Sequence, residues 1–154
     1  MICKFLVALD GSPRARPVLF AAANLAEFLR ATMDLLRVIT IPPEFPAAAH
    51  ATQGDPLPAF MEREAYDAMR VLLSSLPRIP MCQLRVRQGA QPWRPIIDVA
   101  DEIEADLIVL GSHGYYAIDR LIGTTAARVA NMARRNVLVI HNGEARARLG
   151  PSSS

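Results

Sequence analysis

Five β-prone runs alternate along this 154-residue chain with segments whose apolar residues recur at helical spacing. The runs over 2–9 and 106–110 are almost wholly apolar, which is typical of strands buried on both faces of a sheet. The other three expected strands span 33–40, 81–88 and 137–141. Strands that alternate with helices form a parallel sheet covered by helices on both faces. The sequence therefore predicts one α/β domain with an open parallel sheet.

The helices are predicted from the spacing of apolar residues and from the breaks between them. The expected helices run from the turn at 10–13 to about Arg30, over 61–76, over 96–103 and over 124–135. Ser12 and Pro13 make a good N-cap and first helical residue. Arg134 and Arg135 should close the last helix, where positive charge suits the helix dipole. The run over 81–88 alternates apolar and charged residues, which predicts an edge strand, and residues 41–58 are expected to form a long loop.

Composition narrows the class of partner. The formal net charge is +2, with 51% hydrophobic and 21% charged residues, so neither nucleic acid nor a membrane is expected as a partner. The two cysteines, Cys3 and Cys82, form no CxxC pair, which fits a reducing compartment and argues against a metal site. The first strand does not resemble a signal peptide, and no run is long enough to span a bilayer, so a cytoplasmic location is expected. Residues 142–154 are predicted to be a flexible tail.

Unusual residues follow two of the expected strands. Asp10-Gly11-Ser12 comes at the carboxyl end of the first strand. Gly111-Ser112-His113-Gly114 follows the fourth strand, and Gly123-Thr124-Thr125 begins the last helix. In open parallel sheets, ligands bind outside the carboxyl ends of the strands, where the strand order reverses. If the first and fourth strands are neighbours, these segments line one crevice.

The residue types in the second segment favour a phosphate ligand. Glycines allow close approach of the backbone, and the free amides at a helix N-terminus attract anions. Thr124 and Thr125 add hydroxyl donors, and His113 offers a further donor. Asp10 suits a base edge or a ribose hydroxyl, because its charge would repel a phosphate. The alternative is that these residues form ordinary turns and helix caps without a ligand.

These motifs together resemble the universal stress protein family over residues 1–141. The resemblance rests on VALDGS at 7–12, ADLIVLGSHG at 105–114, GTT at 123–125 and VLVI at 137–140. It implies a universal stress protein domain over 1–141 whose single five-stranded parallel sheet has the order 3-2-1-4-5, with helices on both faces. This is a Rossmann-like fold of the adenine-nucleotide α-hydrolase type. The resemblance also implies a homodimer and ATP binding.

The resemblance assigns roles to particular residues. It implies that Asp10 and the backbone of Val38 hold adenine, and that the backbone at Ala8 and Leu9 lines the pocket floor. It places ribose and phosphates on the residues of the glycine loop and the following helix: Leu110, Gly111, Gly114, Gly123, Thr124 and Thr125. Eight residues separate Gly114 from Gly123, one fewer than is commonest in the family, and Tyr115 and Tyr116 add bulk to this spacer.

The expected function is ATP binding, with or without Mg²⁺, in stress response or regulation. No GxxxxGK[ST], GxGxxG or GxSxG motif is present, and no general base faces a γ-phosphate, so the chain is not expected to be an enzyme beyond slow, incidental ATP hydrolysis. An adenylating enzyme is disfavoured, because no SGGxDS-type loop follows the first strand. The alternative is a dimeric interaction protein with a vestigial nucleotide site. Under both interpretations, the apolar run over 137–140 is expected to pair with the same run of a second copy across a two-fold axis.

Overall fold

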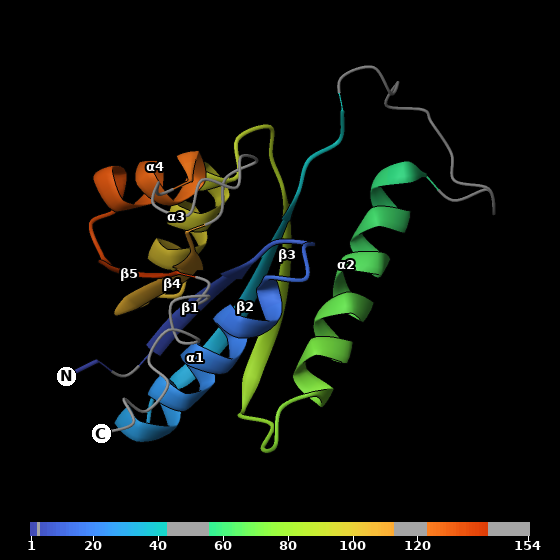
Figure 1. Cartoon of the computed structure of the whole chain (residues 1–154). Coiled ribbons are helices and arrows are strands. Elements are labelled where there is room, and N and C mark those ends of the chain that lie inside the picture. The colour runs from blue at the N-terminus through green and yellow to red at the C-terminus, as the bar shows by residue number, and fades with distance from the viewer. Residues whose placement is uncertain (3, 43–55, 113–122, 142–154) are drawn as a thin grey trace, which may run out of the picture.

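The computed structural model describes residues 1–2, 4–42, 56–112 and 123–141 (Figure 1). In these ranges, five parallel strands form one sheet in the order β3-β2-β1-β4-β5, which confirms the predicted order. The strands are β1 (Lys4–Leu9), β2 (Thr32–Ile39), β3 (Cys82–Gln88), β4 (Leu107–Gly111) and β5 (Asn136–Ile140). The helices are α1 (Ala15–Leu29), α2 (Leu57–Ser74), α3 (Trp93–Glu102) and α4 (Thr124–Met132).

The helices cover both faces of the sheet, and the side-chain alternation of each strand divides the core in two. Phe5, Val7 and Leu9 of β1 pack on the face covered by α1 and α2. Leu6 and Ala8 of the same strand pack on the face covered by α3 and α4. Phe5, Leu6 and Val7 have no exposed surface, and complete burial of such side chains contributes roughly 1.5–3 kcal/mol each. The continuous apolar run at 2–9 is explained by this burial on two sides.

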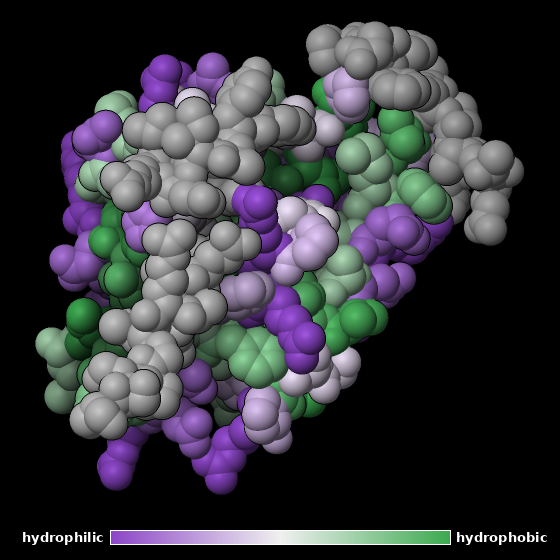
Figure 2. All heavy atoms as spheres, in the orientation of Figure 1, coloured by the Kyte–Doolittle hydropathy of each residue, from purple (hydrophilic) through white to green (hydrophobic). Residues whose placement is uncertain are grey.

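The outer surfaces of the helices are mixed in polarity. In the space-filling view, purple and green side chains are interspersed over α1 and α2 (Figure 2). No helix in the described part of the chain is long and apolar enough to cross a membrane. The alternating run that predicted an edge strand is β3, which lies at one end of the sheet order.

One charged side chain is buried beside this edge strand. Asp34 of β2 is 4% exposed, and its Oδ2 accepts a hydrogen bond of 3.0 Å from Nε of Arg85 on β3. Gln83 donates its backbone N–H to the other carboxylate oxygen at 3.4 Å. Arg85 also donates to the side-chain oxygen of Gln83 at 2.8 Å. Asp34 therefore ties β3 to the sheet through side chains as well as through the ladder.

Several predicted helix boundaries are wrong. The helix predicted over 61–76 begins at Leu57, and the one predicted over 96–103 begins at Trp93. The first helix begins at Ala15, not at Pro13, because Ser12 belongs to a turn: its Oγ donates to Asp10 Oδ1 at 2.6 Å and accepts from the backbone N–H of Arg14 at 3.2 Å. The last helix ends at Met132, and Ala133 is already extended. The predicted loop 41–58 falls mostly on residues outside the described ranges, but its last two residues are already part of α2. Cys3 and the predicted tail at 142–154 also lie outside the described ranges.

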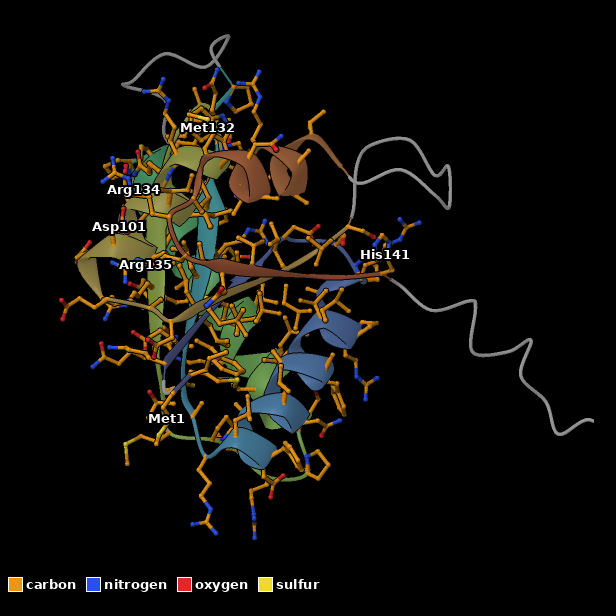
Figure 3. All side chains as sticks on the ribbon, turned by 90° about the vertical axis from the view of Figure 1, so that its left-hand side faces the viewer. Met1, Asp101, Met132, Arg134, Arg135 and His141 are labelled. Carbon is orange, nitrogen blue, oxygen red and sulfur yellow. The ribbon has the colours of Figure 1, made fainter. Side chains whose placement is uncertain are left out.

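The early end of α4 leaves Arg135 with a different role from the one expected. Its Nε donates to Oδ1 of Asp101 on α3 at 2.9 Å, and its Nη1 donates to the carbonyl of Ala105 at 3.3 Å. Figure 3, which looks onto the β5 side of the molecule, shows Arg135 and Asp101 next to each other. Arg135 thus joins the start of β5 to the end of α3 and does not complement the dipole of α4.

Cys82 offers a test of the surroundings of β3. Burial, and to a smaller extent the charge of Asp34, raise the pKa of the Cys82 thiol. A raised pKa lowers the thiolate fraction at a given pH, and the thiolate is the reactive form. We expect iodoacetamide at pH 8 to modify Cys82 more slowly than free cysteine, as followed by peptide mass spectrometry. The difference should disappear in denaturing urea, and equal rates in the folded protein would contradict this environment.

Candidate functional site

A cavity of about 870 Å³ opens at the carboxyl ends of β1, β2 and β4. This size falls within the range that holds nucleotide-sized ligands. Because β1 lies between β2 and β4, the cavity sits where the chain order of the strands reverses. Eight of the residues predicted from sequence line it: Ala8, Leu9, Asp10, Val38, Leu110, Gly111, Thr124 and Thr125.

The turn after β1 forms part of the cavity wall. Oδ1 of Asp10 accepts a hydrogen bond of 2.9 Å from the backbone N–H of Ser12, and another of 2.6 Å from the Ser12 hydroxyl. These two bonds fix the carboxylate against its own turn, as in an Asx turn. Gly11 and Ser12 also line the cavity, together with Arg14 at the start of α1.

The floor of the cavity is apolar. Leu36, Ile96 and Leu110 reach it from β2, α3 and β4, and each is at most 4% exposed. Ala8 lies beside them on β1, where its small side chain leaves room above the sheet. A flat ring such as a purine base would be desolvated here.

The N-terminus of α4 forms another part of the cavity wall. Gly123 is the N-cap residue, and no side chain caps the helix within the part of the chain described. The first turn contains no acidic residue, so the positive end of the helix dipole is not neutralised from within the helix. Gly123 donates its N–H to the carbonyl of Ser112 at 2.7 Å, which ties the start of α4 to the end of β4. Thr124 and Thr125 line the cavity. Such an end attracts anions.

The structure does not place all the predicted residues in the cavity wall. Gly123 acts as the N-cap of α4 and is not one of the lining residues. His113 and Gly114 lie outside the described residues, as do Tyr115 and Tyr116 of the spacer. Ten lining residues were not predicted as site residues, although two of them belong to the predicted Asp10 turn: Gly11, Ser12, Arg14, Ala15, Val18, Leu36, Arg37, Thr40, Pro92 and Ile96.

Arg37 is the most consequential of these additional residues. It stands on β2 between Leu36 and Val38, and its guanidinium lies against Gly11, because a Cβ on Gly11 would overlap Nη2 and lie only 2.6 Å from Nη1. Burial lowers the pKa of Arg37, while the nearby charge of Asp10 raises it in part. The sequence signal was a single arginine near the carboxyl end of a mainly apolar strand, within DLLRVIT.

Comparisons with known proteins agree with this architecture. The profile of the Usp (universal stress protein) family matches residues 1–141. Universal stress protein A homolog 1 of Coxiella burnetii is 30% identical over 138 residues, which cover 88% of this chain and 93% of that protein. The structure of universal stress protein UspA from Lactobacillus plantarum superposes with a TM-score of 0.69 at 29% identity, covering 90% of this chain and 97% of the other.

The chain belongs to the universal stress protein family. A further structural neighbour is the universal stress protein of Archaeoglobus fulgidus in complex with dAMP, with a TM-score of 0.58, 23% identity, and coverage of 91% of this chain and 99% of that one. That likeness establishes the shared fold.

Proposed function

We propose that this universal stress protein binds an adenine nucleotide, ATP, in the cavity at the carboxyl ends of β1, β2 and β4. The observation that carries the proposal is the make-up of the cavity wall, which combines Asp10, an apolar floor and the first turn of α4. These three features match the base, the rings and the phosphates of a nucleotide, respectively. The dAMP complex of the Archaeoglobus fulgidus relative supports the same ligand class.

The roles of individual residues follow from their places. Asp10 and the backbone of Val38 bind the adenine, while Ala8, Leu9 and Leu110 line its floor. Gly111 lets the ribose approach the end of β4. Thr124 and Thr125 bind the phosphates together with the amides of the first turn of α4. Gly123 has no side chain that could cap those amides, so they stay available to the phosphates. His113 and Gly114 complete the phosphate end.

We propose a binding function and not a catalytic one. The described residues include no cluster of three His, Cys, Asp or Glu side chains that could hold a metal ion. A Mg²⁺ ion accompanying ATP would therefore be held chiefly by the phosphates and water, as is common for Mg²⁺. ATP hydrolysis would be slow, and the nucleotide would act by stabilising one conformation for stress response or regulation. The predicted cytoplasmic location belongs to this proposal.

The proposal is tested by identifying what the protein carries. The purified protein is denatured with acid, and the released small molecules are separated by chromatography. We expect an adenine nucleotide, and we expect added millimolar ATP to raise the melting temperature of protein freed of ligand. If nothing is released and ATP leaves the melting temperature unchanged, the nucleotide site is vestigial and the chain is an interaction protein of the same fold.

The outer edge of β5 predicts a homodimer. This strand pairs only with β4 among the described strands, and Val137 to Ile140 are all half-buried. An apolar edge of this kind invites pairing with a second copy. We expect sedimentation at micromolar concentration to give a dimer, and Val139→Lys to give a monomer. Gln88→Lys, on the opposite sheet edge, is the matched control and should remain dimeric. A monomeric wild-type protein would overturn this prediction.

A further inference from the structure

We propose that Arg37 is a specificity-determining residue that reads the base together with Asp10. In this arrangement Arg37 donates to a ring nitrogen of the ligand, and Asp10 accepts from the exocyclic amino group beside that nitrogen. The inference rests on the proposed function, because it concerns how the same cavity selects its nucleotide.

The hydrogen-bonding state of Arg37 is the first observation. Its side chain is half-buried in the cavity wall, yet no residue in the described ranges accepts a hydrogen bond from it or forms an ion pair with it. A guanidinium carries five N–H donors, and withdrawing them from water without a partner is costly. Such a group at the wall of a cavity is poised for an acceptor supplied by the ligand.

The second observation is the arrangement of Asp10 beside Arg37. Both hydrogen bonds that Asp10 accepts from Ser12 end on Oδ1, which leaves Oδ2 without a hydrogen bond from any described residue. The absence of a side chain on Gly11 lets the guanidinium of Arg37 lie against the turn that holds this carboxylate. A donor and an acceptor are therefore presented side by side at one end of the cavity.

The charges identify which part of the ligand meets this pair. A phosphate on Arg37 would come under the repulsion of Asp10, whereas the uncapped start of α4 has no acidic residue in its first turn. A neutral acceptor next to a donor avoids that repulsion. Adenine has this pattern, because its amino group donates and the ring nitrogens on either side of it, N1 and N7, accept. The pair therefore suits an aminopurine base.

The test compares ATP with 1-deaza-ATP and 7-deaza-ATP, in which one ring nitrogen is replaced by carbon. Calorimetric titrations are made on the wild type, on Arg37→Met and on Arg16→Met. Arg16 is exposed on the outer side of α1 near Phe20 and is absent from the cavity wall, so it controls for the loss of one positive charge. Arg37→Met should weaken ATP binding about tenfold or more, as expected for loss of a charge-assisted hydrogen bond. Arg16→Met should leave it unchanged.

The analogues decide between a direct contact and a structural role. In the wild type, one of the two analogues should bind about tenfold more weakly than ATP, and in Arg37→Met that penalty should vanish because the donor is gone. Without ligand, Arg37→Met should melt no lower than the wild type. Gly11→Ala, which displaces the guanidinium but keeps its charge, should also weaken ATP binding.

Two failures are distinguishable. If the wild type binds ATP and each analogue carries the same penalty in the wild type and in Arg37→Met, the inference fails while the proposed function stands. If the wild type binds no ATP, the proposed function fails and this inference fails with it.

Discussion

A Thr125→Asp variant is expected to bind ATP about 100-fold more weakly than the wild type while retaining its full stability. The residue lies in the first turn of α4 and lines the cavity at the end assigned to phosphates. A carboxylate at this position would repel the negative charges of the phosphates. The same carboxylate would lie at the positive end of the helix dipole, where an acidic residue is favourable.

The two effects have opposite signs, and this makes the variant informative. A change that merely damaged the fold would lower both the affinity and the melting temperature. We expect the melting temperature without ligand to stay at or slightly above that of the wild type, because the first turn of α4 contains no acidic residue at present. Asn131→Asp is the matched control, since it adds the same charge to the exposed far end of the same helix.

Calorimetric titration gives the affinity of the three proteins, and scanning calorimetry gives their stability. Asn131→Asp should bind ATP nearly as well as the wild type. If Thr125→Asp bound ATP as tightly as the wild type, the assignment of the phosphates to the start of α4 would be wrong.

An Asp34→Ala variant is expected to lose about 3 kcal/mol of unfolding free energy, the largest stability effect that the charged residues of this fold predict. The carboxylate is 6% exposed and its partner Arg85 is 20% exposed. Removing the carboxylate leaves a largely buried guanidinium with only the Gln83 side chain as a described partner. The value is placed at the lower end of the range for buried pairs because Arg85 keeps some access to water.

Urea denaturation measures this loss, and two further variants explain it. Asp34→Leu combined with Arg85→Leu should recover most of the stability, since an apolar pair removes the uncompensated charge. Asp67→Ala is the control: this carboxylate forms an ion pair of 2.7 Å with Arg70, but their side chains are 68% and 63% exposed. Its loss should change stability by less than about 0.5 kcal/mol. A double variant no more stable than Asp34→Ala would contradict the account.

The parts of the fold that local sequence decides were predictable. Phe5, Leu6 and Val7 belong to an apolar run because both faces of β1 are covered, and such a run is visible without a structure. The order of the strands is not a local property, and it was available only through the family resemblance. The end of α4 was misplaced because Arg135 is held by Asp101, which lies 34 residues earlier in the chain.

The candidate site also contains residues that local sequence predicts and residues that it does not. Asp10, Gly111 and Thr124 stand at strand ends or helix starts, and those positions are marked by residue types that interrupt the regular pattern. Arg37 lies inside a strand that also contains the buried Asp34, and a charged residue in a strand is compatible with many environments. The place of Arg37 in the cavity wall depends on Gly11, which lies 26 positions away in the sequence. Because Gly11 has no side chain, the guanidinium can lie against it. A contact of this kind follows from the register of β1 and β2, which pairs Leu9 with Arg37.

Photoaffinity labelling with 8-azido-ATP, followed by sequencing of the labelled peptides by mass spectrometry, tests most directly that the cavity binds an adenine nucleotide. We predict that the label is attached at the ends of β1 or β2, within residues 8–12 or 36–40, and that excess ATP prevents the labelling. Labelling that ATP does not compete with, or a label confined to α2 or β3 away from the cavity, would contradict the central claim.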